Sequence, residues 1–415
     1  MMNIAIIGYG IVGSGVSEII RENAQCIEHK ACEQITVKKI LDIRDFTDSP
    51  DSSLFTKNPE EIFCDPEISV VVETIGGIGV AYEYTKRALG AKKHVVTSNK
   101  ELVATHGPEL IELAAANQVS YLFEASVGGG IPIIHSLNQC LAANRISGVT
   151  GILNGTTNYI LTQMQREGRD FNDALEGAQR KGYAESNPSD DIEGIDACRK
   201  ISILSSIAYN EFVDCTDVYT EGISKISPVD IQYAEAMHST IKLIAISKRE
   251  GNRVFARVSP AIISMNHPLA NVNDVFNAIV VKGDAVGETM FYGKGAGKLP
   301  TASAVVGDVV DIAKNKGSCR SLWDRKGYNN ILPVGDSKTR YFVRVSIRNS
   351  VEAVKCVERI FDSIEFVKPG ANELAGEIAF TTSKQSEQQL SGWVKELNES
   401  APVKGIINII RIEEE

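Results

Sequence analysis

The first 20 residues constrain the fold of this chain more than any other stretch. Residues 3–7 form a short apolar run that fits a buried strand, and the sequence GYGIVG follows directly at 8–13. A helical apolar pattern then continues through Ile20. In a G-x-G-x-x-G turn between a strand and a helix, the glycines permit the tight turn, a close approach of a pyrophosphate, and close packing of the helix. This order predicts a dinucleotide-binding unit; the alternative is a glycine-rich turn that binds nothing.

Strands and helices alternate through the rest of the first 125 residues. Strands are expected at 36–43, 69–74, 94–97 and 120–124, helices at 81–89 and 109–117, and a loop over the polar stretch 45–65. Such alternation indicates an α/β fold with a parallel, doubly wound Rossmann-type sheet, whose ligands bind at the carboxyl ends of the strands. Lys100 follows one strand end, where it can meet a substrate carboxylate or join a proton transfer. An ordinary surface lysine fits this position equally well.

The end of the second expected strand carries both an acid and a base. Asp42 would accept a hydrogen bond from the ribose 2′-hydroxyl of NAD, whereas Arg44 would suit the 2′-phosphate of NADP. Because the acid and the base are only two residues apart, either could face the ribose, and the sequence leaves the choice between NAD and NADP open.

Composition limits the class of protein. The chain has 415 residues, enough for two or three domains, with 43% hydrophobic and 23% charged residues, as in ordinary soluble proteins. A net charge of -10 argues against nucleic-acid or anionic-membrane partners, and no apolar run is long enough to span a bilayer. Eight cysteines without a C-x-x-C pair, six histidines without metal spacing and no visible signal peptide predict a cytoplasmic protein without a zinc site.

An acidic stretch at 182–200, GYAESNPSDDIEGIDACRK, is the most unusual part of the chain. Its second half fits the start of a helix, on which Asp196 and Lys200 stand at i and i+4 and therefore within reach of each other. A carboxylate that orients a lysine ammonium is a common arrangement for a proton donor. The competing interpretation is a solvated acidic loop that caps an ordinary helix.

Two further segments carry polar or glycine-rich motifs. Residues 124–132, EASVGGGIP, combine one acid with exposed carbonyls, which are hard oxygen ligands for a cation, but a glycine hinge explains the same composition. The NGTTN turn at 154–158 offers hydroxyls, amides and backbone donors to a small polar substrate.

Taken together, these motifs resemble those of homoserine dehydrogenases. The motifs that carry the resemblance run in family order from residue 8 to residue 303: GYGIVG at 8–13, VVTSNKEL at 96–103, EASVGGGIP at 124–132, GILNGTTNYIL at 151–161, GYAESNPSDDIEGIDACRK at 182–200 and GKGAGKLPTAS at 293–303. No aspartokinase-like segment precedes them, so the resemblance implies the single-function form of the family.

The resemblance also implies an activity and its residues. Family members interconvert L-homoserine and L-aspartate 4-semialdehyde with NADP or NAD, on the way to threonine, methionine and isoleucine. By matching motifs, Lys200 would be the proton donor and acceptor, Asp196 would orient it, Lys100 would lie at the substrate and nicotinamide, and Glu185 and Asp191 would bind the substrate. The implied cofactor-binding residues are Gly8, Gly10, Ile11, Val12, Gly13, Asp42, Arg44, Ser98, Lys100 and Gly297. The implied cation site, usually described with sodium, comprises Glu124, Val127, Gly129 and Ile131.

The family pattern predicts three domains. The dinucleotide-binding domain would comprise residues 1–131 plus 296–320, and a substrate-binding and dimerisation domain would comprise 132–295, so a homodimer or homotetramer is expected. Within the latter, a helical stretch is expected at 229–250 and β-like runs at 254–264 and 277–282. After a polar linker at 327–338, residues 338–415 should form a ferredoxin-like βαββαβ domain that resembles a regulatory ACT domain.

Two questions stay open at the level of sequence. The ACT pattern has an acid and a glycine after its first strand, whereas this chain has RNSVE at 348–352, so threonine regulation and a purely oligomerising role are both open. A non-catalytic sensor of a dinucleotide and an amino acid, and a dehydrogenase of another small amino-aldehyde, are the alternative functions.

Overall fold

The computed structural model describes residues 1–315, 322–327, 330–369 and 375–414. The chain divides into two compact units. The first comprises Met1–Val149, Arg199–Cys215 and Ile279–Asn329, and the second comprises Thr150–Cys198, Thr216–Ala278 and Asn330–Glu415. Strands β7 (Ile146–Ile152) and β12 (Phe276–Gly283) and helix α10 (Ile195–Tyr209) contribute residues to both.

The first unit contains a parallel sheet with the strand order β3-β2-β1-β4-β5-β6. Its strands are β1 (Met2–Ile7), β2 (Ile35–Leu41), β3 (Phe55–Thr56), β4 (Ile68–Glu73), β5 (His94–Thr97) and β6 (Tyr121–Leu122). The strand order reverses between β1 and β4, which makes the carboxyl ends of these two strands the topological switch point. The predicted doubly wound parallel sheet is confirmed.

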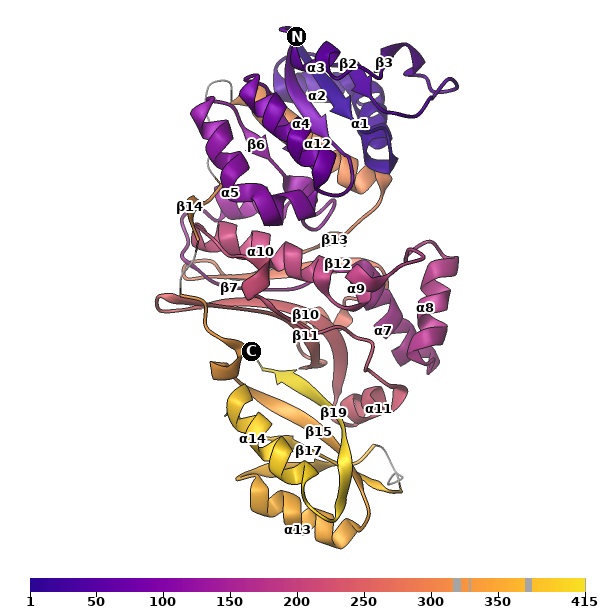
Figure 1. Ribbon diagram of the computed structural model, residues 1–415, viewed down its shortest axis with the longest axis vertical. Coiled ribbons are helices and arrows are strands. Elements are labelled where there is room, and N and C mark those ends of the chain that lie inside the picture. The colour runs from indigo at the N-terminus through magenta and orange to yellow at the C-terminus, as the bar shows by residue number, and fades with distance from the viewer. Residues whose placement is uncertain (316–321, 328–329, 370–374, 415) are drawn as a thin grey trace. The chain divides into compact units, whose positions relative to one another are not determined.

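Helices pack on this sheet from two parts of the chain. They are α1 (Ile11–Glu22), α2 (Ala24–Ala31), α3 (Glu60–Phe63), α4 (Gly79–Gly90), α5 (Lys100–Ala116) and α12 (Lys298–Lys314). Apolar residues of α1, α2 and α12 share one buried cluster with the sheet, while α4 and α5 pack against each other. Helix α12 comes from late in the chain and lies among elements of the amino-terminal third (Figure 1).

Two elements of this part differ from expectation. The helix expected at 109–117 begins much earlier, at Lys100, because the side chain of Asn99 caps it and Pro108 is accommodated inside it. The stretch 45–65, expected to be a loop, contains β3 and α3. Strand β3 forms because it pairs with the edge of β2, a contact between distant residues that local composition does not reveal.

The rest of the first unit follows the parallel sheet. It includes α6 (Ile133–His135), parts of β7, β12 and α10, the edge strand β13 (Gly287–Lys294), and the short pair β8 (Glu211–Phe212) and β14 (Asp324–Gly327). The β-like run predicted at 277–282 corresponds to β12.

The second unit begins with helices and a long hairpin. Its elements are α7 (Gly155–Glu167), α8 (Phe171–Arg180), α9 (Ser189–Ile192), β9 (Tyr219–Thr220), α11 (Pro228–Ala236), β10 (Ser239–Glu250) and β11 (Arg253–Ser264). The helix predicted at 229–250 is wrong in its second half, where residues 239–250 form β10 and pair with β11 along their whole length. Since β10 is buried without alternation over residues 239–247, its apolar run carries no strand period to distinguish it from a helix.

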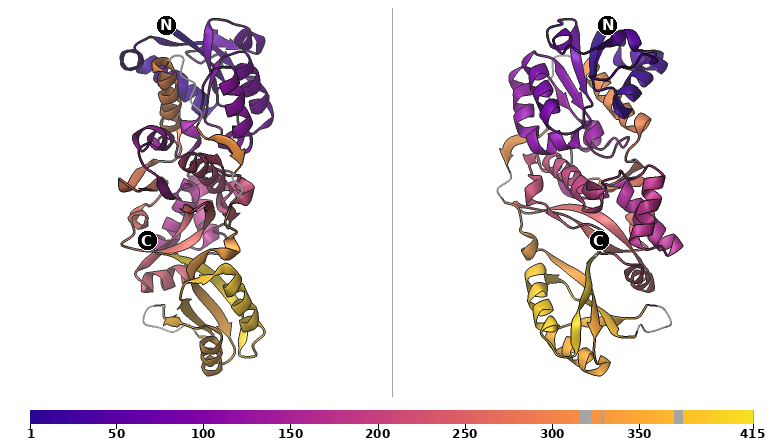
Figure 2. Two further views of the ribbon diagram at one scale, coloured as in Figure 1. Left: turned by 90° about the vertical axis from the view of Figure 1, so that its left-hand side faces the viewer. Right: turned by 45° about the vertical axis from the view of Figure 1, so that its right-hand side comes forward.

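The carboxyl-terminal part of the second unit has the βαββαβ order predicted. It comprises β15 (Lys338–Ile347), α13 (Ser350–Ile360), β16 (Ile364–Val367), β17 (Glu377–Thr382), the two-residue β18 (Gln385–Ser386), α14 (Glu387–Asn398) and β19 (Val403–Glu413). The strands lie in the order β19-β15-β17-β16, which is the ferredoxin-like arrangement, and α13 and α14 cover one face of them (Figure 2). Strand β19 also pairs in parallel with β11, so this sheet continues into the hairpin.

The predicted linker at 327–338 includes residues 328 and 329, which lie outside the described part of the chain. Among the described helices, none is long and apolar enough to cross a membrane.

Candidate functional site

The glycine turn after β1 is closely packed at its ends and open in its middle. Gly8 has a φ of +93°, a left-handed value that favours glycine, and a Cβ on Gly13 would lie 2.0 Å from the carbonyl oxygen of Gly8. Apart from Gly10 itself and its two chain neighbours, no heavy atom lies within 4 Å of the position that a Cβ on Gly10 would take. At the end of β4, the hydroxyl of Thr74 donates to the Gly8 carbonyl at 2.7 Å. Since α1 begins at Ile11 and Val12, this turn has the geometry of a pyrophosphate cradle.

Asp42 and Arg44, which follow β2, are bound to each other. The Asp42 carboxylate accepts hydrogen bonds from Arg44 Nε at 3.0 Å, from Arg44 Nη2 at 2.9 Å and from the backbone N–H of Tyr9 at 2.7 Å. These bonds, with that of Arg44 the strongest, lower the pKa of Asp42 to about 2. The acid at this strand end is therefore ionised and already paired with a cation.

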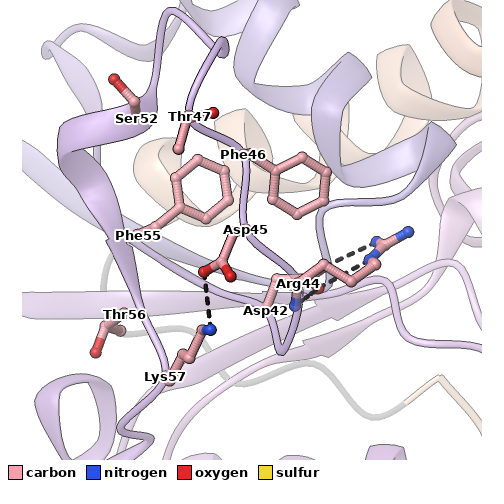
Figure 3. A pocket seen from close by; sticks show the side chains of 9 residues that line it. All are labelled: Asp42, Arg44, Asp45, Phe46, Thr47, Ser52, Phe55, Thr56 and Lys57. Atoms are coloured by element: carbon pink, nitrogen blue, oxygen red, sulfur yellow. Dashed lines mark hydrogen bonds and ion pairs between the residues drawn. The ribbon is translucent and has the colours of Figure 1, made fainter.

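A pocket of about 350 Å³ lies over this pair. It is lined by Asp42, Arg44, Asp45, Phe46, Thr47, Ser52, Phe55, Thr56 and Lys57. Figure 3 shows two ion pairs at the pocket, Arg44 with Asp42 and Lys57 with Asp45, the latter at 2.8 Å. The Arg44 guanidinium lies over the Phe46 ring, 5.0 Å from its centroid, and its side chain is 59% exposed.

A buried acid links the ends of β4 and β5. Glu73 is 1% exposed, and its carboxylate accepts hydrogen bonds from the Thr97 hydroxyl at 2.5 Å and from the backbone N–H of Ile75 at 2.6 Å. Burial raises the pKa of Glu73 to about 7. The carboxylate thus holds the turn after β4 against the last residue of β5.

Asn99 extends this connection to the start of α5. Its backbone N–H donates to Thr97 Oγ1 at 2.9 Å, and its side chain donates to the Gly77 carbonyl at 2.6 Å. Its Oδ1 accepts from the backbone N–H of Leu102 at 3.0 Å and so caps the helix. Ser98 and Lys100, both predicted site residues, flank Asn99 and are therefore fixed at the ends of these strands.

An ion pair joins α5 to α10 within the first unit. Arg199 contacts Glu101 at 2.9 Å, and these residues are the immediate neighbours of Lys200 and Lys100. Lys200 is buried, and Asp196 precedes it by one helical turn on the same face of α10. The structure therefore brings the start of α5 and the lysine of the acidic stretch to one region.

Two acids of the same stretch share one partner in the second unit. The side-chain amide of Asn154 donates to Asp191 at 2.7 Å and to Asp196 at 2.9 Å, while its oxygen accepts from the Thr157 backbone at 2.8 Å and caps α7. Glu185 lies on the exposed segment between α8 and α9, where its backbone carbonyl accepts a hydrogen bond from Gln179.

Glu124 is the centre of a second buried acidic pair. Its carboxylate accepts hydrogen bonds from the backbone N–H groups of Ile134 at 2.9 Å and His135 at 2.6 Å, and its own backbone N–H donates to Asp308 at 2.9 Å. Burial raises the pKa of Glu124 to about 7, and burial together with the nearby Glu124 raises that of Asp308.

The other predicted residues of the 124–132 segment lie close by in the chain. Val127 and Ile131 are buried, and Gly129 has a left-handed φ of +56° and packs against the backbone of Gly295. Gly297 is the residue before α12 and has a φ of +128°. Within the described residues, no cluster of three His, Cys, Asp or Glu side chains could hold a metal ion.

Sequence reasoning missed the residues that hold the predicted ones in place. The sequence marks Asn154 only as part of a polar turn, and it gives no separate signal for Glu73, Thr97 or Asp308. An asparagine before a predicted helix is a cap signal that could have drawn attention to Asn154. Glu73 and Thr97 end two apolar strands and Asp308 lies inside a helix, and the partners of all three are known only from the fold.

The raised pKa of Glu73 makes stability depend on pH. The folded protein keeps the Glu73 proton that the unfolded chain releases between pH 4.5 and 7, so stability falls as pH rises through this window. Glu73→Gln, whose amide can still accept from Ile75 and donate to Thr97, removes this loss. Relative to the unsubstituted protein, the variant should gain about 2 to 3 kcal/mol in unfolding free energy between pH 5 and pH 8.

Urea denaturation at the two pH values measures this difference, and Glu83→Gln at an exposed position is the control. An equal difference between variant and unsubstituted protein at pH 5 and pH 8 would contradict the assignment.

Comparison with known proteins identifies the family. The family model "Homoserine dehydrogenase, NAD binding domain" matches residues 8–124, and the model "Homoserine dehydrogenase" matches residues 132–310. The homoserine dehydrogenase of Bacillus subtilis is 37% identical over 427 aligned residues, covering 99% of this chain and 98% of the relative.

Solved structures agree with these matches. The crystal structure of a homoserine dehydrogenase from Thiobacillus denitrificans has a TM-score of 0.92 and 37% identity and covers 100% of this chain and 98% of its own. A hyperthermophilic archaeal homoserine dehydrogenase in complex with NADPH has a TM-score of 0.63 and 30% identity and covers 75% of this chain and 97% of its own. The chain belongs to the homoserine dehydrogenase family.

Proposed function

We propose that Lys200 is the proton donor and acceptor in the homoserine dehydrogenase reaction of this chain, and that Asp196 orients it. The observation that carries the proposal is the ion pair between Arg199 and Glu101, which joins the helix of Lys200 to the helix that begins at Lys100. Lys100 itself follows the end of β5, next to the switch point at which dinucleotide folds bind their ligands.

The proposed reaction needs a positively charged group next to the reacting oxygen of the substrate. Reduction of L-aspartate 4-semialdehyde to L-homoserine develops negative charge on the aldehyde oxygen. A positioned ammonium of Lys200 stabilises that charge and delivers a proton to the oxygen; in the opposite direction the neutral amine accepts the proton of the homoserine hydroxyl. Lys100 adds a second positive charge, which suits the carboxylate of an amino-acid substrate.

The acids of the same region suit the other end of the substrate. The Asn154 amide donates to both Asp191 and Asp196, and two carboxylates at one place suit a substrate ammonium or a lysine. We assign Asp191 and Glu185 to binding of the substrate ammonium and hydroxyl end. Glu185 is exposed, so its carboxylate is accessible to a substrate.

The glycine turn fits a nicotinamide dinucleotide. A Cβ on Gly13 would collide with the turn itself, while the space over Gly10 is open, as a pyrophosphate requires. Gly8, Gly10, Ile11, Val12 and Gly13 would hold the pyrophosphate, and Ser98, Lys100 and Gly297 would lie near the rest of the cofactor. When bound, the cofactor supplies or accepts the hydride.

The pocket beside Asp42 favours NADP over NAD. The Asp42 carboxylate is occupied by Arg44 and Tyr9, so a ribose 2′-hydroxyl would have to compete with them. Arg44 and Lys57 are paired with Asp42 and Asp45, but both side chains are more than half exposed and have further N–H groups that can donate to a 2′-phosphate. We therefore infer that the chain accepts both cofactors and binds NADP more tightly.

A monovalent cation near Glu124 is a further part of the proposal. Two buried acids, Glu124 and Asp308, lie side by side with raised pKa values, and the carbonyls of Val127, Gly129 and Ile131 belong to the same segment. A sodium ion held by Glu124 and these carbonyls would offset the buried negative charge.

The carboxyl-terminal βαββαβ part supports an ACT-like assignment. We propose that it serves regulation by an amino acid or oligomerisation in a cytoplasmic homodimer or homotetramer. Its ferredoxin-like strand order supports the fold, and the RNSVE sequence at 348–352 favours oligomerisation over threonine binding.

Replacement of Lys200 tests the central assignment. Lys200→Ala should lower kcat for L-homoserine oxidation by at least about a hundredfold, the usual scale for a positioned acid or base. Steady-state kinetics with NADP measure the effect, and Lys225→Ala, at an exposed lysine, is the control. Turnover of the Lys200→Ala variant at the unsubstituted rate would refute the role.

Replacement of Arg44 tests the cofactor preference. Arg44→Ser should raise KM for NADPH by roughly tenfold to a hundredfold, since hydrogen bonds to charged groups contribute about 1.5 to 3 kcal/mol, and should leave KM for NADH nearly unchanged. Arg87→Ser is the matched control, because Arg87 is also a half-exposed arginine in an ion pair of the same sheet region. Parallel changes for both cofactors would argue against selection by Arg44.

Salt titration tests the cation site. Sodium chloride should raise the thermal midpoint more than choline chloride at equal ionic strength, by about 2 °C or more near saturation. Glu124→Gln should abolish that difference. Equal responses of the unsubstituted protein to the two salts would speak against the site.

A further inference from the structure

Lys242 on β10 is a buried cation that the proposed chemistry does not use. Its side chain is 1% exposed, and its ammonium donates to the carbonyl of Val272 at 2.7 Å, to Asn273 Oδ1 at 3.0 Å and to Asn158 Oδ1 at 3.3 Å. These acceptors match the three donors of an ammonium and are all neutral oxygens. The ammonium therefore connects β10 to α7 through Asn158 and to the segment before β12 through Val272 and Asn273.

The segment that Lys242 holds has a strained backbone. Residues 272–276 lead into β12, which begins at Phe276, and Asp274 within them has a φ of +56°, which costs free energy for a residue other than glycine. The side-chain NH2 of Asn158, on α7, lies within hydrogen-bond distance of the carbonyls of Val272 at 3.2 Å, Asp274 at 3.0 Å and Phe276 at 3.1 Å, which share its two hydrogens. Asn158 can do so only while its own oxygen faces Lys242, so the lysine sets the orientation of this amide.

The same segment lies directly against the first turn of α7. A Cβ on Gly155 would lie 2.8 Å from the carbonyl oxygen of Val275, and the backbone N–H of Asp274 donates to Thr162 Oγ1 at 3.1 Å. Asn154 caps that turn and holds Asp191 and Asp196. A shift of residues 272–276 would therefore move the cap and the two acids with it.

We propose that Lys242 is a positioning residue, a built-in cation that locks residues 272–276 against α7 and thereby sets the position of Asn154 and its two acids. The inference rests on the roles proposed for Asp191 and Asp196. Lys242 touches neither of them, so its effect on the reaction passes through Asn158 and the first turn of α7.

Lys242→Met tests the inference, because methionine has a similar length and no donor. The variant should raise KM for L-homoserine and lower kcat, together reducing kcat/KM by about tenfold to a hundredfold, the scale of a small misplacement of binding groups. KM for the nicotinamide cofactor should stay within about twofold, since the glycine turn belongs to the first unit.

Lys93→Met is the matched control for the loss of a buried lysine. Lys93 is 4% exposed and donates to the carbonyls of Asp65 at 2.6 Å and Ile68 at 2.8 Å, at the amino-terminal end of β4 and away from the carboxyl strand ends that carry the site. Both variants should lower the thermal midpoint, but only Lys242→Met should change KM for L-homoserine. Equal kinetic changes in the two variants, or unchanged kinetics in a folded Lys242→Met protein, would overturn the inference.

Two further variants separate the possible failures. If Lys242→Met does not fold, Asn273→Ala removes one acceptor from a partly exposed position and should raise KM for L-homoserine by a smaller factor; an unchanged KM would overturn the inference. Asp191→Asn tests the proposed function itself. If Asp191→Asn raises KM for L-homoserine and Lys242→Met does not, the positioning role fails alone; if Asp191→Asn has no effect, the substrate assignment fails.

Discussion

The amide of Asn154 donates to Asp191 and Asp196 at once, and the acidic stretch takes its local form from that pair of hydrogen bonds. Two carboxylates this close repel each other unless donors stabilise them. Because the amide also caps α7, the position of the acids is tied to the position of a helix, and through that helix to the hairpin of β10 and β11. Asp196 is thus part of the packed core, whereas Asp191 is half-buried at its edge.

In the first unit, polar contacts likewise fix the carboxyl ends of the strands. Glu73 is buried between β4 and β5, and Asn99 carries its connection to the start of α5. The ion pair of Arg199 with Glu101 then joins α10 to this point. Each contact is between side chains or backbone groups from different elements, so the lysines of the site depend on several independent supports.

Regular elements could be predicted from the sequence where a local signal decides them. The glycine turn, the short apolar strands of the parallel sheet and the βαββαβ order of the carboxyl-terminal part are such cases. Prediction went wrong at β10, where an apolar run buried on both faces has no period of its own, and at β3, which exists only because β2 offers it an edge. The early start of α5 depends on a single cap by Asn99, which apolar periodicity does not register.

The sequence by itself determined the family and the residue types of the site. The glycine motif is one continuous segment of chain, and so is the acidic stretch with the lysine that ends it, so each can be recognised locally. Only the tertiary structure decided how those residues are held. Asn154 donates to two acids that lie more than 30 residues away in the sequence. Lys242, on β10, donates to the strained segment 272–276. Local sequence cannot specify such contacts, since the burial that makes a polar group need a partner arises only when distant elements pack together.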